Sequence, residues 1–527
     1  MDDLPLSRRQ FVTGAGTLAA ASVFAPQALA ARLTGLRAPT LRGGRFAEGV
    51  ISGDPTPNGI TLWSRLAGVG GNGSVELEVA KDKGFRRVVA RQLIGTSRSL
   101  DHAVKARVGK LDAHEEYFYR FSTKTADSPV GRFRTALPAD SRQPVKFAFF
   151  SCQDYTFGFF NVQELIARED IDFVVNLGDY IYAEAYHTKG SQSGGVRTDP
   201  VGESRTLDQY RRKYKVYRST DASLRKMHAK FPMISTWDDH EAQDNYAGGA
   251  GPSGGLDPAK RYSKARQAAA YRAFFDSMPT YGKPKSAPRI YRSFRFGRNV
   301  ELFVVDERQY RADQPCGDAQ VGDPCPELNG PRQFLGRPQM SFLKNGLKNS
   351  KAQWKVIANE VMIMNTIYPG GKYIGFDSWQ GYVAERTELL QHIKANNIKD
   401  VVFVTGDIHT LIAGDVRIDG KDSEAVATEF VGGSITSQGL GEGGGGIIPG
   451  ADPHNPKTPD SIRQLLFDSN PWVKDADTDH HGYGLVSAKP AGFSCKLRRV
   501  DTVKRRSTTR LPDLAFTVRP GHPSLLS

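Results

Sequence analysis

The chain has 527 residues, enough for two or three domains, and its formal net charge is +14. Apolar residues make up 39% of it and charged residues 24%, a balance that excludes a disordered or membrane-embedded protein. Lysine and arginine are spread along the chain rather than gathered in a stripe, so a dedicated nucleic-acid-binding protein is not expected. The positive field suits an anionic substrate or lipid instead.

Residues 1–30 predict a twin-arginine signal peptide. Arg8 and Arg9 precede a weakly apolar stretch at 11–25, and Ala28-Leu29-Ala30 matches an A-x-A cleavage signal. The stretch is too short for a membrane span, so no transmembrane segment is expected in the mature protein. We therefore expect the twin-arginine export machinery as a partner and a periplasmic or extracellular location. The alternative is an ordinary N-terminal helix with a chance arginine pair.

Residues 40–140 predict an N-terminal β-sandwich. Runs of β-branched and aromatic residues at 60–63, 75–79 and 117–121 are separated by turn signals rich in proline, asparagine and glycine. Strands this short and this closely spaced, with no chemical cluster among them, indicate an immunoglobulin- or fibronectin-like sandwich. A polar stretch at 139–144 marks the linker that follows.

From residue 145 to residue 527, strands alternate with helices, a pattern that predicts an α/β catalytic domain. Apolar runs predict the strands and apolar periodicity predicts the helices. The expected strands lie at 145–150, 173–175, 234–237, 300–305, 354–358 and 401–404, and the expected helices at 162–168 and 207–230.

Four of these strands end in polar or ionisable residues. In open α/β sheets this edge is where ligands bind, and burying so many acids together without cations would leave like charges unpaired. Bound metal would resolve that conflict. The clusters are Ser151-Cys152, Gly178-Asp179-x-x-Tyr182, Asp238-Asp239-His240-Glu241 and Gly406-Asp407-x-His409.

The ligand types divide into two kinds of metal site. Cysteine, tyrosine and histidine with an aspartate suit a transition ion, iron above all. Oxygen-only ligands suit a hard divalent ion, Ca²⁺ more than Zn²⁺. The first set is Cys152, Tyr182 and His409; the second is Asp179, Asp239, Asn359 and Asp407, with Asp179 as the natural bridge.

The remaining cysteines and the glycine-rich segment suggest structural roles. Cys316 and Cys325 bracket a loop rich in proline, glycine and aspartate, and in an exported protein this spacing favours a local disulfide. Cys495 lies in a strand-like run and is expected to pack. The segment 432–450 predicts a mobile loop, either a gate over substrate or a plain connector.

The order of the four clusters resembles the PhoD-type alkaline phosphatase and phosphodiesterase family, relatives of the purple acid phosphatases. The resemblance covers nearly the whole chain, including the export signal and the N-terminal β-domain. It implies a four-layer α/β/β/α metallophosphoesterase domain over 145–527, with Fe³⁺ and one or more Ca²⁺ ions.

The resemblance also assigns roles by position. It implies that Cys152, Asp179, Tyr182 and His409 hold iron and that Asp179, Asp239 and Asp407 hold calcium. Asp238 is either a calcium ligand or a residue that contacts the ligands without binding calcium itself. Asn359 falls where relatives often have a histidine, and it is a possible oxygen ligand. His240 is the expected catalytic and substrate-binding histidine, which contacts phosphate or protonates the leaving group. Arg308 is a candidate to bind phosphate, with a structural ion pair as the alternative.

The expected function is metal-assisted hydrolysis of phosphate esters by water, with no serine nucleophile motif and no covalent intermediate. The ions would orient the phosphate, neutralise developing charge and lower the pKa of a bridging water. Substrates would be small phosphate esters, or phosphodiester polymers or lipids. Two alternatives remain: a phospholipase D-type phosphodiesterase, and a catalytically silent surface protein that keeps calcium for stability.

Overall fold

The computed structural model describes residues 39–191, 194–248, 263–281, 288–319, 321–420, 423–442 and 458–525. The predicted signal peptide at 1–30 and the end of the glycine-rich segment, 443–450, lie outside these ranges. Within them, residues from 40 onward form one unit, and none of the described helices is long and apolar enough to span a membrane.

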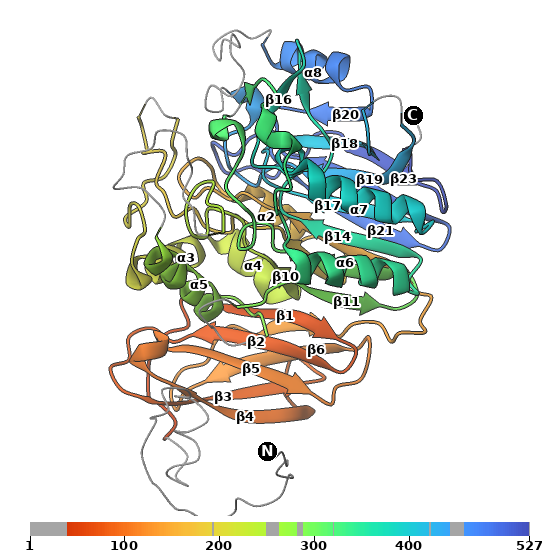
Figure 1. Ribbon diagram of the computed structural model, residues 1–527. Coiled ribbons are helices and arrows are strands. Elements are labelled where there is room, and N and C mark those ends of the chain that lie inside the picture. Colours follow the sequence, from red (N-terminus) through yellow and green to blue (C-terminus); the bar gives the residue numbers. More distant parts are fainter. Residues whose placement is uncertain are drawn as a thin grey trace, which may run out of the picture. The chain divides into compact units, whose positions relative to one another are not determined.

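Two large sheets form the centre of the described structure (Figure 1). The nine-stranded sheet has the order β23 (Leu514–Val518), β22 (Gly492–Arg499), β21 (Gly482–Lys489), β8 (Val145–Phe150), β9 (Phe173–Asn176), β10 (Met233–Ser235), β1 (Val50–Thr56), β2 (Gly59–Arg65) and β5 (Ala103–Gly109). The seven-stranded sheet has the order β11 (Arg292–Phe296), β12 (Val300–Val304), β14 (Trp354–Asn359), β17 (Val401–Thr405), β19 (Ala425–Gly432), β18 (Leu411–Arg417) and β20 (Val473–Asp477).

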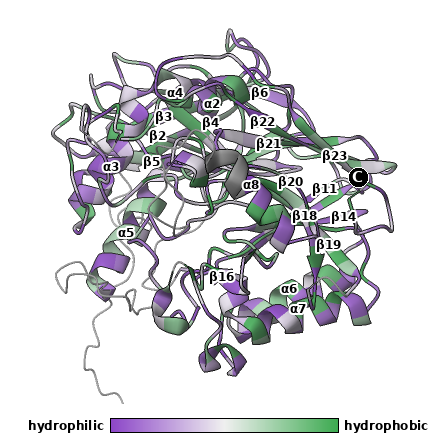
Figure 2. Cartoon of the chain, turned by 90° about the horizontal axis from the view of Figure 1, so that it is seen from above, coloured by the Kyte–Doolittle hydropathy of each residue, from purple (hydrophilic) through white to green (hydrophobic). Residues whose placement is uncertain are grey.

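Helices cover the outer face of each sheet. The helices that pack with the nine-stranded sheet are α2 (Asn161–Ile166), α3 (Leu207–Thr220), α4 (Ala222–Lys230) and α5 (Lys264–Ser277). Those on the seven-stranded sheet are α6 (Arg337–Asn349), α7 (Val383–Ala395) and α8 (Thr458–Ser469). In Figure 2, α6 and α7 carry both hydrophobic and hydrophilic residues, as expected of helices with one buried side.

Three hydrophobic cores correspond to the three interfaces of a four-layer α/β/β/α fold. One core joins α2–α5 to the nine-stranded sheet, a second joins α6–α8 to the seven-stranded sheet, and a third lies between the two sheets. The predicted architecture is therefore confirmed. Both faces of β9 and β17 are covered, so these strands are fully buried and consist mostly of apolar residues. Such short apolar runs can be recognised in the sequence.

The parallel strands bring the predicted clusters to one edge of each sheet. In the first sheet β9 runs parallel to both β8 and β10, and in the second β14 runs parallel to β12 and β17. The polar residues that follow these strands therefore leave the sheets on the same side.

The N-terminal β-sandwich is present, and one of its two sheets continues the nine-stranded sheet. Its second sheet has the order β4 (Val88–Thr96), β3 (Gly73–Ala80), β6 (Glu116–Ser122) and β7 (Gly131–Arg134), and a separate core lies between it and β1, β2 and β5. Strand β1 pairs in parallel with β10 through Gly53 and Met233. The sequence shows no sign of this pairing, because it joins segments 180 residues apart.

Local differences from the expected elements have simple causes. The helix expected at 207–230 is two helices, because Asp221 leaves the helical conformation and caps α4 by accepting from the amides of Ser223 (3.0 Å) and Leu224 (3.3 Å). The disulfide expected between Cys316 and Cys325 is present, beside a small sheet of β13 (Val321–Gly322), β16 (Lys372–Ile374) and β15 (Ile367–Tyr368). Cys495 is buried in the core between the sheets, as expected.

Replacing Phe173 with alanine tests the packing that holds the two sheets together. Its ring stacks on Phe147 of the same sheet at 5.1 Å and on Phe296 of the opposite sheet at 4.2 Å. Loss of this buried side chain should lower the free energy of unfolding by about 3–5 kcal/mol in denaturant titrations. Leu93→Ala on β4, where the side chain is 43% exposed, is the control and should change it by less than about 0.5 kcal/mol. Equal effects would mean that this stack does not hold the layers.

Candidate metal centre

Four of the predicted ligands have an unusual backbone conformation. Cys152, Asp179, Asp407 and His409 have φ angles of 58°, 52°, 67° and 56°, in the left-handed region that non-glycine residues rarely adopt. Each such residue costs on the order of 1–3 kcal/mol unless its surroundings enforce it. All four lie in the turns that follow β8, β9 and β17, so the strain is concentrated at the edge where the predicted clusters meet.

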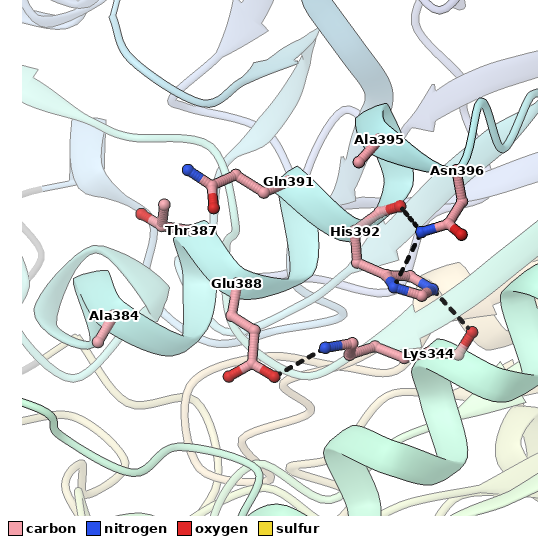
Figure 3. Close-up of a pocket in the computed structure, with 8 residues that line it drawn as sticks. All are labelled: Lys344, Ala384, Thr387, Glu388, Gln391, His392, Ala395 and Asn396. Atoms are coloured by element: carbon pink, nitrogen blue, oxygen red, sulfur yellow. Dashed lines mark hydrogen bonds and ion pairs between the residues drawn. The ribbon is translucent and has the colours of Figure 1, made fainter.

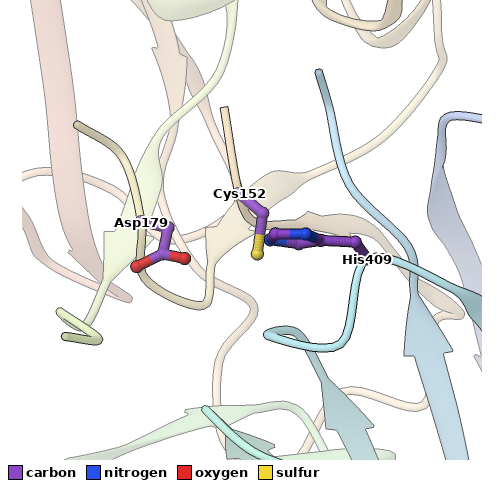
Figure 4. A group of neighbouring side chains, drawn as sticks. All are labelled: Cys152, Asp179 and His409. Atoms are coloured by element: carbon purple, nitrogen blue, oxygen red, sulfur yellow. The ribbon is translucent and has the colours of Figure 1, made fainter. Parts of the chain in front are cut away.

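The first group of possible ligands combines sulfur, nitrogen and oxygen. The Cys152 thiol, an Asp179 carboxylate oxygen and a ring nitrogen of His409 lie within 4.8 Å of one another (Figure 4). The Tyr182 hydroxyl lies 3.2 Å from Asp179 Oδ2 and 3.1 Å from His409 Nε2. The structure therefore brings together all four residues predicted for an iron site.

Two further groups continue from the first. Asp179, Asp239 and His240 form one, and Asp238, Asp239 and Asp407 form the other, each with possible ligand atoms within 4.8 Å of one another. Asp179 belongs to the first two groups and Asp239 to the last two. The three groups are therefore one continuous set, and Asp179 lies at the junction between its sulfur-containing and oxygen-rich ends.

Arg308 lies among the carboxylates of the oxygen-rich end. Its side chain is fully buried, and its guanidinium pairs with Asp238, with Asp239 and Asp377 at 3.4 Å each, and with Asp407 at 3.1 Å. The ion pairs of Arg308 are therefore present, and its contact with phosphate stays a prediction. Sequence reasoning missed Asp377, which lies in an irregular stretch outside every motif.

His240 is held in a fixed orientation by a residue that the sequence did not indicate. Its Nδ1 lies 2.8 Å from Glu184 Oε2, and its ring stacks on Tyr182 with centroids 4.0 Å apart. Its backbone amide donates to Asp179 Oδ1 at 3.2 Å. The other ring nitrogen, Nε2, lies 3.9 Å from Asp239 Oδ2, beside the middle group of possible ligands.

Asn359 ends β14 with its side chain fully buried and hydrogen-bonded. Its Nδ2 donates to the Val361 carbonyl and to Thr405 Oγ1 (3.3 Å), and its Oδ1 accepts from Trp379 Nε1 at 3.1 Å. Trp379 therefore fixes the direction of the only atom of this side chain that could bind a cation.

The glycine-rich segment contacts the site through residues that the structure describes, Ser437 and Gln438. Ser437 Oγ lies 2.5 Å from the Tyr182 hydroxyl oxygen and 2.9 Å from the Cys152 carbonyl, and the Gln438 carbonyl lies 2.9 Å from His409 Nδ1. Residues 433–438 therefore contact the site, and the mobility of the segment stays a prediction. Glycine content alone could not reveal contacts with residues so distant in the sequence.

Burial opposes ionisation of the predicted ligands. It raises the pKa values of the Cys152 thiol, the Tyr182 phenol and the Asp179 and Asp407 carboxyls well above their usual ranges, and neighbouring acids add to the effect. The pKa of His409 falls to about 4, also through burial. The thiol, the phenol, the two carboxyls and the imidazole of His409 therefore all favour their neutral forms.

Positive groups already counter this effect at the oxygen-rich end. Burial would raise the pKa of Asp239, but Arg308 and His240 outweigh it and hold that pKa below its usual range. Burial raises the pKa of Asp238 to about 6 even with Arg308 beside it. Arg308 pairs with four carboxylates, and Arg311 is a second positive group that acts to lower the pKa values of Asp238 and Asp239. The donor atoms of the set suit bound cations.

A surface depression lies away from these groups. It has a volume of about 560 Å³ and lies between α6 and α7, where Lys344 pairs with Glu388 at 2.8 Å and its carbonyl meets His392 Nε2 at 3.0 Å (Figure 3). None of the predicted site residues lines it.

Two sheets packed between helices, with three linked groups of possible metal ligands at their edge, form a metallophosphoesterase-like fold. The chain belongs to the PhoD-like phosphatase family: the family model matches residues 147–497, and the model of the family's N-terminal domain matches residues 31–137. The resemblance seen in the sequence is confirmed, and the chain is a phosphoric ester hydrolase.

Individual relatives agree with this assignment. The chain is 36% identical over 453 residues to alkaline phosphatase D of Bacillus subtilis (strain 168), which covers 82% of this chain and 77% of the relative. A solved structure of PhoD superposes with a TM-score of 0.83 at 31% identity and covers 93% of both chains. A purple acid phosphatase from yellow lupin (Lupinus luteus) seeds shares the fold, with a TM-score of 0.53 at 12% identity over 89% of this chain and 73% of that one.

Replacing Gly178 with alanine tests the close approach of two ligand-bearing turns. Gly178 has a φ of +107°, and an added Cβ would lie 2.4 Å from Asp238 Cβ and 2.6 Å from its backbone nitrogen. Gly190 is the matched control. Its φ is also positive, at +74°, but a Cβ added there would have no atom within 4 Å. The Gly178 variant should lose about 1–3 kcal/mol more unfolding free energy than the Gly190 variant. Equal losses in thermal or denaturant unfolding would contradict the contact.

Proposed function

We propose that this phosphoric ester hydrolase is an exported, metal-dependent enzyme that releases phosphate from monoesters and diesters by attack of water. The observation that carries the proposal is the continuous set of ligand groups joined by Asp179 and Asp239. Family membership and the similarity to an alkaline phosphatase support the same conclusion.

The donor atoms favour two kinds of ion. We assign Cys152, Asp179, Tyr182 and His409 to Fe³⁺, since thiolate, phenolate and imidazole together suit a transition ion. We assign the carboxylate oxygens to Ca²⁺, because they are hard ligands. The calcium ligands are Asp179, Asp238, Asp239 and Asp407, with Asn359 as a further oxygen ligand. When bound, such ions supply Lewis-acid stabilisation of phosphate charge and lower the pKa of a water molecule.

The protein's own groups orient the substrate and move the proton. Glu184 fixes Nδ1 of His240, so Nε2 is the nitrogen available to contact phosphate or to protonate the leaving oxygen. Arg308 reduces the repulsion among the carboxylates that surround it. Burial excludes water from most of the set, which strengthens the electrostatic interactions within it.

The organisation of the chain follows from the same proposal. A twin-arginine signal at 1–30 would export the folded protein to the periplasm or beyond, a sandwich domain would span 40–140, and a catalytic domain 145–527. The disulfide between Cys316 and Cys325 supports an oxidising compartment.

The function is tested by assaying purified protein on an aryl phosphate, a bis-aryl phosphate and phosphatidylcholine, with Ca²⁺ and with chelator, while measuring metal content. We expect turnover of the aryl esters that chelator abolishes and Ca²⁺ restores. Turnover of phosphatidylcholine alone would identify the phospholipase D-type alternative. If protein replete with iron and calcium hydrolyses none of the three, the proposed activity is wrong.

The Tyr182→Phe variant tests the iron assignment. If the protein is coloured by charge transfer from the Tyr182 phenolate to iron, the visible absorption band should disappear in this variant. Tyr186→Phe is the control, since the centroid of that ring lies 6.2 Å from that of Tyr182 and 5.7 Å from that of His240, and Tyr186 is not among the predicted ligands. Persistence of the band in Tyr182→Phe would refute the assignment.

A further inference from the structure

Glu241 ends the Asp238-Asp239-His240-Glu241 cluster, yet it belongs to none of the three groups of possible ligands. Its side chain is 1% exposed and accepts three backbone hydrogen bonds. Oε1 accepts from the amide of Tyr180 at 2.6 Å, and Oε2 accepts from the amides of Asp179 at 3.0 Å and Asp238 at 2.9 Å. One carboxylate thus connects two turns that both carry possible ligands.

These hydrogen bonds extend the pairing of β9 and β10 beyond the ends of the strands. The last paired residues are Asn176 and Ser235, so the turns that follow have no sheet ladder to align them. Gly178 allows the turns to approach closely, and the carboxylate of Glu241 then fixes their relative position. Three backbone hydrogen bonds to one buried side chain restrict the movement of the two turns relative to each other.

The same contacts bear directly on Asp179. Its amide is held by Glu241, its Oδ1 accepts from the His240 amide at 3.2 Å, and its Oδ2 accepts from the Tyr182 hydroxyl at 3.2 Å. Its left-handed φ of 52° needs such external support. Asp179 is also the residue shared by the sulfur-containing group and the group with Asp239 and His240, so its position sets the distance between them.

We propose that Glu241 is a positioning residue that fixes Asp179 against Asp238 and Asp239 and so sets the spacing of the two cation sites before any ion binds. The inference rests on the ligands assigned in the proposed function and adds what holds them in place. Glu241 holds backbone amides with both oxygens and belongs to none of the groups of possible ligands, so it acts through the ligands.

Glu241→Gln is the test, with Glu385→Gln as the matched control. Glu385 is also a buried glutamate, 5% exposed, whose Oε2 accepts from the amides of Phe334 (3.0 Å) and Leu335 (2.8 Å), and it too lies outside the ligand groups. An amide has one acceptor oxygen, so glutamine at 241 sets an NH₂ group against a backbone N–H, whereas glutamine at 385 can keep both hydrogen bonds on its single oxygen.

The measurement is Ca²⁺ and Fe³⁺ content as each ion is titrated into metal-depleted protein. Glu241→Gln should need at least about tenfold more metal ion for half-loading, while Glu385→Gln should stay close to the wild type. Equal loading curves for Glu241→Gln and the wild type, or equal shifts in both variants, would overturn the proposal. This readout does not depend on turnover, so failure of the proposed activity and failure of the positioning role are distinguishable.

Hydrogen exchange of the wild type provides a second measurement if Glu241→Gln fails to fold. In metal-depleted protein, peptides covering 178–182 and 236–240 should keep slow amide exchange, because Glu241 holds the Asp179, Tyr180 and Asp238 amides without ions. Exchange in these peptides that becomes as fast as in an unfolded chain after metal removal would show that ions, not Glu241, align the two turns.

Discussion

Burial of negative charge between two sheets is the constraint on which the rest of the structure depends. Asp179, Asp238 and Asp239 are each no more than 2% exposed, and an unpaired carboxylate at such a depth is strongly unfavourable. The structure compensates by three means: the guanidinium of Arg308, the histidine held by Glu184, and backbone amides turned toward carboxylates. Asp179 itself lies in a left-handed turn, with a φ of 52°, at the end of its strand.

Backbone amides also donate to buried carboxylates near the strand ends of the second sheet. Glu307, after β12, accepts from the Glu360 amide at 2.9 Å, and Glu360, after β14, accepts in return from the Glu307 amide. Glu360 also accepts from Thr236 Oγ1 at 2.6 Å, which connects the end of β10 to the other sheet. Glu429 on β19 accepts from the Ile363 and Met364 amides and from Thr405 Oγ1. Buried glutamates therefore link neighbouring strand ends across both sheets, and the turns with functional side chains form one hydrogen-bonded framework.

The sequence predicted much of this arrangement, for reasons that are physical and local. Strands such as β8, β9 and β17 are apolar runs followed by polar residues. Both the strands and the clusters around Cys152, Asp179 and Asp407 can therefore be recognised in the sequence. What it could not give depends on contacts between distant residues. Glu184 and Asp377 lie in stretches without periodicity, so nothing in the sequence singles them out. The glycine content of residues 433–438 predicts flexibility, and their contacts with Tyr182, Cys152 and His409 cannot be seen in the sequence.

Because β1 pairs with β10, removing the N-terminal strands would expose an edge of the nine-stranded sheet. The sandwich core and the catalytic core meet in one hydrogen-bonded sheet, and residues 40–527 form one unit. A chain shortened to begin at residue 145 would leave β10 as a bare edge strand of apolar Met233 and Ile234, open to pairing with other molecules. The N-terminal strands thus protect an edge of the larger sheet, and because they come first in the chain they are available for pairing as soon as β10 has been made.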